Sequence, residues 1–134
     1  KPIIQGQEPA RFARPLVQSM FFDHSKVQEI KIATRSMSAI SGQLYRQMLE
    51  CLVTFDFRKQ LPSLTMPTLC IAGDEDSTAP SKIIQEMSEK IPNSEFVCIR
   101  QTGHLAYIEQ PDSFNDILTR FLVNAPLGRN LDHE

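Results

Sequence analysis

Residues 67–80 read Pro-Thr-Leu-Cys-Ile-Ala-Gly-Asp-Glu-Asp-Ser-Thr-Ala-Pro. The run Thr68–Ala72 is short and apolar and lies between a proline and a glycine, which predicts a buried strand. Because the run is apolar without alternation, we expect both faces of this strand to be covered, as in a parallel sheet. The acidic loop Asp74–Asp76 follows at the carboxyl end of the strand, where open α/β sheets bind ligands.

The residues after this loop predict a strand–helix–strand–helix order. Helix signals begin at Pro80 and Ser81, Glu95–Ile99 forms a second apolar run, and Pro111 opens a last helix with apolar residues at helical spacing. This order is typical of two parallel strands joined by a right-handed crossover, so the fold class is α/β. Two such strands need further strands beside them, which indicates one part of a larger fold.

The residues before the apolar run predict helices only. We expect one helix opened by Pro15, a second N-capped by Ser25 and a third from about Ser41 to Val53. The sequence therefore divides into a helical region of residues 1–56, an α/β region of residues 57–123 and a polar tail of residues 124–134.

The composition excludes several classes of protein. Lys and Arg number 14 against 16 Asp and Glu, for a net charge of −2, whereas a dedicated nucleic-acid binder shows a basic excess. No apolar run reaches the roughly 18 residues of a membrane span. The cysteines number 3 and form no C-x-x-C pair, which predicts neither a disulfide framework nor a metal site and favours the reducing cytosol.

Two candidate site loops follow the predicted strands, one at Asp74–Asp76 and one at His104. The carboxyl ends of adjacent parallel strands meet at one sheet edge, so an aspartate of the first loop can contact the histidine of the second. Such a pair forms two members of a nucleophilic triad. We favour Asp76, which stands furthest from its strand, and expect Asp74 and Glu75 to face solvent. From the residues alone, a solvated acidic turn and a surface histidine remain equally open, and His24 and His133 are interpreted as surface residues.

Four segments, in order, resemble the α/β-hydrolase family. Residues 67–80 resemble its P-T-L-x-I-x-G-x-x-D-x-x-x-P segment, and the others are residues 91–94 (I-P-x-S), residues 103–111 (G-H-x-x-x-x-E-x-P) and the final helix around residues 114–122. The resemblance covers about residues 57–123 and is strongest to esterases and enol-lactonases. It implies the C-terminal portion of an α/β-hydrolase fold preceded by a helical cap at residues 1–56, with Asp76 as triad acid and His104 as triad base.

The nucleophile of that family is not found in this sequence. The family places it on a G-x-S-x-G elbow before the cap, and none of the 5 glycines begins such a motif. We expect none of Ser77, Ser81, Cys70 and Cys98 to replace it, since none follows a strand at such an elbow. With Lys1 where a starting Met is usual, the sequence is interpreted as the C-terminal half of a hydrolase, inactive alone.

The resemblance implies hydrolysis of a small-molecule carboxylic ester or lactone by a Ser-His-Asp mechanism, with no cofactor. The alternatives are acyl transfer or carbon–carbon bond hydrolysis on the same scaffold, and a non-catalytic ligand-binding protein of this fold. An exposed edge on strand Thr68–Ala72 predicts self-association or pairing with the missing half. Five residues of the cap either line an acyl pocket or pack the cap against the core: Met20, Phe21, Phe22, Met37 and Met48.

Overall fold

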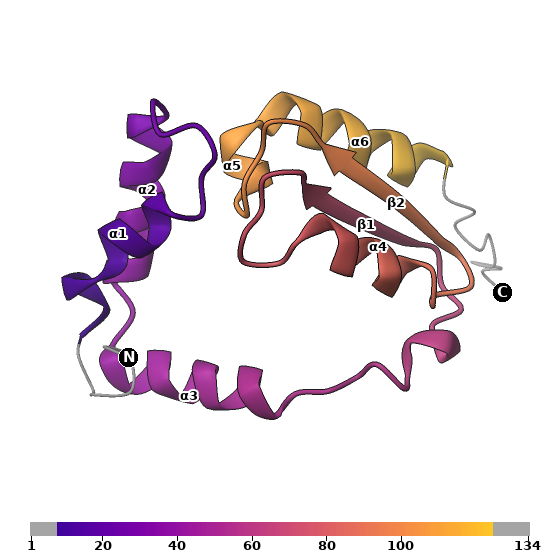
Figure 1. Ribbon diagram of the computed structural model, residues 1–134, viewed down its shortest axis with the longest axis horizontal. Helices are drawn as coiled ribbons and strands as arrows, with labels where there is room; N and C mark the ends of the chain where they lie inside the picture. Colours follow the sequence, from indigo (N-terminus) through magenta and orange to yellow (C-terminus); the bar gives the residue numbers. More distant parts are fainter. Residues whose placement is uncertain (1–7, 125–134) are drawn as a thin grey trace, which may run out of the picture.

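The computed structural model describes residues 8–124, and its first part is helical. After the short 3₁₀ helix η2 (Pro9–Arg11) come α1 (Ala13–Gln18), α2 (Val27–Ser38) and α3 (Gly42–Thr54). Figure 1 shows α1 and α2 side by side near the loops that leave the sheet, while α3 runs along the far side of the molecule. The three predicted helices are therefore present, and "the cap" below is a name for residues 8–56 by position in the chain.

The helices α2 and α3 differ in how their first N–H groups are capped. Ser41 caps α3, because its hydroxyl accepts a hydrogen bond from the Leu44 N–H at 3.2 Å. The prediction that Ser25 caps α2 is wrong, since Lys26 holds the N-cap position. The N–H and hydroxyl of Ser25 instead donate to Oδ1 of Asp23 at 2.9 and 2.6 Å. The Ser25 hydroxyl is thus directed at the Asp23 carboxylate and caps no N–H group of α2.

The second part is the predicted α/β unit. Strand β1 (Thr68–Gly73) pairs in parallel with β2 (Ser94–Ile99), and α4 (Ser81–Ser88) connects them. The chain reaches β1 through η3 (Leu61–Ser63) and leaves β2 through α5 (Ala106–Glu109) and α6 (Pro111–Asn124). In residues 8–124 the sheet has these two strands, with α4 and α6 on either side of them (Figure 1). The α/β class and the element order are confirmed, and the short helix α5 was not predicted.

Residues 125–134, which make up nearly all of the predicted polar tail and include His133, lie outside the described residues. The last described residue, Asn124, ends α6. Within the described residues, no helix combines the length and the apolar character needed to cross a membrane.

The main hydrophobic cluster joins the cap to the loop that follows β2. Its buried members are the cap residues Val17, Phe21, Ile30 and Ala33, and the residues that pack against it are Met37, Leu105 and Ile108. Phe21 and Met37 therefore pack cap against core, as one of the two interpretations proposed. Phe22 and Met48 are 44% and 52% exposed and take no part in this cluster.

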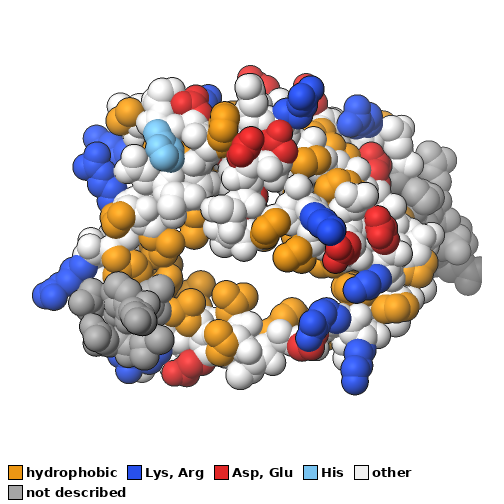
Figure 2. All heavy atoms as spheres, viewed as in Figure 1, with side chains coloured by type: hydrophobic (Ala, Val, Ile, Leu, Met, Phe, Trp, Pro, Cys, Tyr) orange, Lys and Arg blue, Asp and Glu red, His pale blue; other side chains and the backbone are white. Residues whose placement is uncertain are grey.

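Helix α3 carries apolar side chains that the described residues leave uncovered. An apolar groove on this helix is lined by Leu44, Gln47, Met48, Cys51, Leu52 and Phe55. Leu52 and Phe55 are 71% and 67% exposed. Figure 2 shows hydrophobic side chains gathered beside an opening between α3 and the rest of the molecule. A face of this kind commonly marks a contact surface.

Gly73, the last residue of β1, allows a close approach between the two loops that leave the sheet. A Cβ atom at this position would collide with the backbone carbonyl oxygen of Thr102 and lie 2.5 Å from that of Gly103. We therefore expect Gly73→Ala to lower the free energy of unfolding by about 1–3 kcal/mol, measured by urea denaturation.

Gly42→Ala is the matched control for this prediction. A Cβ atom on Gly42 would meet only the end of the flexible Glu8 side chain, and alanine favours the helix there. The loss at Gly42 should therefore be smaller than at Gly73. Equal losses at the two positions would contradict the close approach of the loops.

Candidate active site

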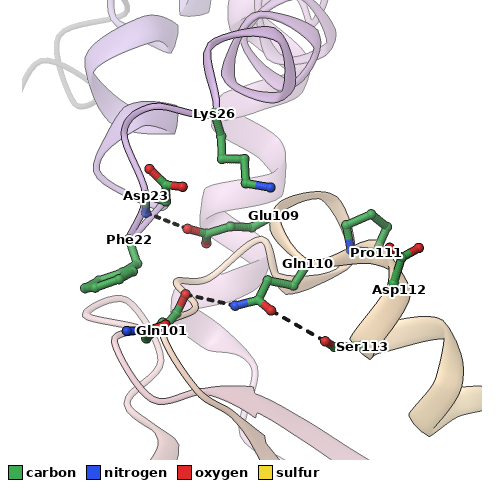
Figure 3. Close-up of a pocket in the computed structure, with 9 residues that line it drawn as sticks. All are labelled: Phe22, Asp23, Lys26, Gln101, Glu109, Gln110, Pro111, Asp112 and Ser113. Carbon is green, nitrogen blue, oxygen red and sulfur yellow. Dashed lines mark hydrogen bonds between the residues drawn. The ribbon is translucent and has the colours of Figure 1, made fainter.

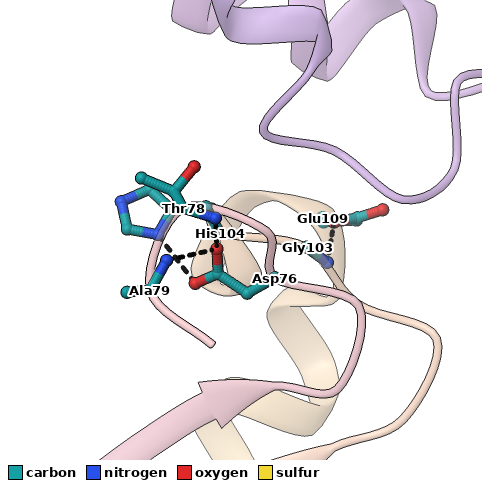
Figure 4. A network of polar contacts seen from close by, with 6 residues as sticks. All are labelled: Asp76, Thr78, Ala79, Gly103, His104 and Glu109. Atoms are coloured by element: carbon teal, nitrogen blue, oxygen red, sulfur yellow. Dashed lines mark hydrogen bonds and ion pairs between the residues drawn. The ribbon is translucent and has the colours of Figure 1, made fainter. Parts of the chain in front are cut away.

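The structure brings Asp76 and His104 together across the carboxyl edge of the sheet. Asp76 lies in the loop after β1 and His104 in the loop after β2, and Nδ1 of His104 lies 2.8 Å from Oδ2 of Asp76 (Figure 4). An ionised carboxylate only accepts hydrogen bonds, so Nδ1–H is the donor. The Asp76 side chain is 6% exposed and that of His104 is 35% exposed. Within residues 8–124, Nε2 of the imidazole has no hydrogen-bond partner, which leaves it open to a reacting group.

The loop itself holds the other oxygen of the Asp76 carboxylate. Oδ1 accepts hydrogen bonds from the N–H groups of Thr78 at 2.7 Å and Ala79 at 2.9 Å (Figure 4). Burial alone would raise the pKa of Asp76, but the hydrogen bonds from Ala79, His104 and Thr78 outweigh it and hold the pKa below its ordinary value of 3.8. At neutral pH the Asp76 side chain is therefore ionised, and its hydrogen bonds to the loop fix its orientation.

The lowered pKa of Asp76 predicts how stability depends on pH. The stabilisation that its carboxylate provides is complete above the ordinary pKa of 3.8 and is lost as the pH falls through the lower pKa of the folded protein. The difference in unfolding free energy between wild type and Asp76→Asn should thus be constant above about pH 5 and shrink towards about pH 2. Urea denaturation across that range measures it, and a difference that grows on acidification would contradict the prediction.

The backbone of the His104 loop is tied to the cap. The His104 N–H donates to the carbonyl oxygen of Met20 at 2.7 Å. The Gly103 N–H donates to Oε2 of Glu109 at 2.8 Å, and Oε1 of Glu109 accepts from the Asp23 N–H at 2.6 Å. Glu109 is 1% exposed. The loop that carries the histidine, the buried glutamate and a cap segment therefore form one hydrogen-bonded unit.

Comparison with known proteins assigns this arrangement to a family. A sequence model described as the alpha/beta hydrolase fold matches residues 32–111. The chain belongs to the α/β-hydrolase family. The pimeloyl-[acyl-carrier protein] methyl ester esterase of Vibrio vulnificus is 34% identical over 95 residues, which are 71% of this chain and 37% of that protein.

Solved structures show the same fold. The enol-lactonase from Burkholderia xenovorans LB400 superposes with a TM-score of 0.83 at 19% identity, covering 90% of this chain and 48% of that one. The esterase from Exiguobacterium antarcticum gives a TM-score of 0.83 at 20% identity, covering 90% of this chain and 46% of that one. The chain thus spans about half the length of these two proteins.

Among the described residues, Asp76 is the hydrogen-bond partner of the His104 imidazole, and the other acids and nucleophiles of the sequence prediction are not. Asp74 and Glu75 are exposed, as expected, although Oδ1 of Asp74 also accepts a 3.3 Å hydrogen bond from the Thr102 N–H. The remaining candidates have no hydrogen bond to His104: Ser77, Ser81, Cys70 inside β1 and Cys98 inside β2. His24 is exposed on the cap. In residues 8–124, no group of three or more His, Cys, Asp or Glu side chains is placed to hold a metal ion.

The loop before His104 contains a residue in an uncommon conformation. Gln101 has a φ of 52°, in the left-handed region. The amide of Gln110 braces this turn, because its Nε2 donates to the carbonyl oxygen of Arg100 at 2.9 Å and to Oγ1 of Thr102 at 2.8 Å. Thr102 is fully buried. The turn before the histidine is therefore held by the side chain of Gln110, which lies between α5 and α6.

A pocket of about 410 Å³ adjoins this brace where cap and core meet. Figure 3 shows the Lys26 side chain pointing toward Glu109 and the Asp23 N–H bonded to the Glu109 carboxylate, with Phe22 beside them. The other lining residues of the pocket are Gln101, Gln110, Pro111, Asp112 and Ser113. Asp76 and His104 do not line this pocket, so it adjoins the site without containing the pair.

Sequence reasoning overlooked Glu109 as a separate contributor to this site. From the sequence, Glu109 is identified only as the acidic position of the G-H-x-x-x-x-E-x-P segment. The available signal was its neighbourhood, because it follows Ile108 in a short, largely apolar stretch directly after the histidine. An acidic residue in such a stretch is buried only when its oxygens find donors.

Proposed function

We propose that this chain is part of an enzyme that hydrolyses a carboxylic ester or a lactone by a Ser-His-Asp mechanism. The observation that carries the proposal is the 2.8 Å contact between His104 Nδ1 and Asp76 Oδ2, with Nε2 open on the other side of the ring. Membership of the α/β-hydrolase family supports it, as does a relative that is itself an ester hydrolase. Location in the cytosol and the absence of a cofactor are parts of the same proposal.

In this mechanism each atom of the pair has one role. The Asp76 carboxylate keeps the proton on Nδ1 of His104 and stabilises the imidazolium when it forms. Nε2 removes the proton from the serine hydroxyl as its oxygen attacks the substrate carbonyl, and then returns that proton to the leaving alcohol. Water hydrolyses the acyl-enzyme by the same steps. With a lactone, the leaving alcohol stays attached to the acyl chain.

The serine nucleophile is proposed to come from a part of the protein outside these 134 residues. No G-x-S-x-G motif occurs in the sequence, and the family carries its nucleophile on that motif. The chain spans 48% of the enol-lactonase of the same fold. We therefore expect the 134-residue chain alone to be inactive, and "complete hydrolase" below means the protein with its nucleophile segment.

Activity assays on the complete hydrolase test this proposal. A panel of p-nitrophenyl esters and simple lactones should be turned over, and a fluorophosphonate should label one serine and stop turnover. Ester consumption that rises with added alcohol would favour the acyltransferase alternative, and turnover of a diketone alone would favour carbon–carbon bond hydrolysis. Ligand binding with neither turnover nor labelling would establish a non-catalytic binding protein.

We further propose that the groove on α3 and the edge of β1 pair with the remaining part of the hydrolase. In the described residues β1 has one strand neighbour, β2, and the groove on α3 is apolar and open. An unpaired strand edge favours association with another strand. The isolated 134-residue chain should therefore self-associate on size exclusion, with apparent mass rising with concentration. A monomer at every concentration would contradict this.

A further inference from the structure

We propose that Glu109 is a positioning residue, which holds the His104 loop in register with Asp76 by fastening it to the cap segment 20–23. This inference rests on the proposed function, because it concerns the base of that reaction. Glu109 is placed at the end of α5, five residues after His104, and its carboxylate reaches back to the loop and across to the cap.

Both oxygens of the Glu109 carboxylate are used. Oε2 accepts from the Gly103 N–H at 2.8 Å and Oε1 accepts from the Asp23 N–H at 2.6 Å. The side chain is 1% exposed, and within residues 8–124 it forms no ion pair. A buried charge is costly unless hydrogen bonds compensate it, and here two backbone N–H groups do so. Removing the carboxylate would leave the buried Gly103 N–H and the part-buried Asp23 N–H without this partner.

The contact is tight on the loop side. Gly103 directly precedes His104, and a Cβ atom on Gly103 would lie 2.9 Å from the Phe22 backbone nitrogen and collide with the Met20 carbonyl oxygen. That same carbonyl oxygen accepts the His104 N–H at 2.7 Å. The loop backbone at Gly103 therefore packs directly against the cap backbone at residues 20–22. The Glu109 carboxylate accepts a hydrogen bond from each of these two segments.

The imidazole itself has fewer hydrogen bonds than the loop backbone that carries it. Its one hydrogen bond among the described residues is the 2.8 Å bond to Asp76, and the side chain is 35% exposed. Its position is thus set mainly by the backbone that carries it. A displacement of about 1 Å at a reacting group can cost about a hundredfold in rate, so a loosened Gly103–His104 backbone would reduce turnover while leaving Asp76 in place.

The test compares Glu109→Gln with Ser88→Ala in the complete hydrolase. Glutamine keeps the size of the side chain but has one acceptor oxygen, so at most one of the two N–H groups stays bonded. Ser88→Ala is the control, because Ser88 is buried and the substitution removes its part-buried 2.8 Å hydrogen bond to Ser94 at the opposite edge of the sheet. We expect Glu109→Gln to lower kcat by about 10- to 100-fold with KM within about threefold, and Ser88→Ala to change kcat less than twofold.

A spectroscopic readout separates this inference from the proposed function. The proton on Nδ1 of His104, bonded to Asp76, should give a low-field NMR signal in wild type and Ser88→Ala that broadens or disappears in Glu109→Gln. An unchanged signal with unchanged kcat in Glu109→Gln would overturn the inference, as would a rise in KM alone. Wild type with no turnover would refute the proposed function instead, and the signal would still test the role of Glu109.

A second variant covers the case in which Glu109→Gln does not fold. Glu109→Asp keeps the charge but shortens the side chain, so it cannot reach both the Gly103 and the Asp23 N–H groups as Glu109 does. We expect a drop in kcat and a weakened Nδ1 proton signal for this variant too. Wild-type values of both in folded Glu109→Asp would overturn the inference.

Discussion

Replacing His104 with alanine in the complete hydrolase is expected to lower kcat by about 10⁴- to 10⁶-fold. The imidazole has an open Nε2, and its Nδ1 is held 2.8 Å from Asp76. Without it, the serine hydroxyl has no base to remove its proton, and the leaving alcohol has no acid to protonate it. Initial rates on an activated ester, measured at one substrate concentration well above KM, report the loss.

His24→Ala is the control for this substitution. His24 is an exposed histidine of the cap, and its loss should change kcat less than twofold. Both variants remove one imidazole from the chain. The difference between their kcat values therefore reports the role of the imidazole at position 104. A His104→Ala enzyme that keeps more than about a tenth of wild-type kcat while folded would refute the assignment of the base.

Replacing Asp76 with asparagine is expected to lower kcat by about 10⁴-fold. The carboxylate accepts the Nδ1–H of His104, so it keeps Nε2 unprotonated and ready to act as a base. The asparagine amide can donate to Nδ1 instead, which would place the proton on Nε2 and block that role. Oδ1 of Asp76 also accepts the N–H groups of Thr78 and Ala79, so part of the loop geometry changes as well.

Glu75→Gln is the control for Asp76→Asn. It removes one negative charge from the adjacent position in the same loop, where the side chain is exposed. Its kcat should stay within about twofold of wild type. The double variant Asp76→Asn/His104→Ala should be no slower than His104→Ala alone, because the carboxylate acts through the imidazole. Additive losses would show that Asp76 has a separate role.

The contact between Asp76 and His104 was predictable from local patterns for a specific reason. Each residue follows a strand by a few positions, and parallel strands bring their carboxyl ends to one edge. The sequence provides weaker grounds for choosing Asp76 over Asp74 and Glu75. The choice depends on how far the loop extends from the strand before its side chain can reach the histidine. In the structure the N–H groups of Thr78 and Ala79 turn the Asp76 carboxylate inwards, a contact that spacing does not reveal.

The role of Glu109 could not be derived in the same way. Its partners are two N–H groups, one of them 86 residues away at Asp23. Every residue except proline has a backbone N–H, so the residue types at Gly103 and Asp23 do not mark them as partners. No sequence pattern therefore pairs them with Glu109. The same limit explains why the prediction of Ser25 as an N-cap is wrong. Ser25 contacts Asp23 instead, and the Asp23 N–H donates to Glu109.

The order of strands and helices, the parallel pairing and the placement of one acid and one histidine at a shared edge all follow from short-range patterns in the sequence. These features depend on apolar periodicity, proline and glycine signals, and the fixed geometry of the crossover. The close approach at Gly73 and Gly103, the burial of Glu109 and the attachment of the His104 loop to Met20 emerge only from the folded chain. They depend on backbone atoms that are distant in sequence, and every residue carries the same backbone groups.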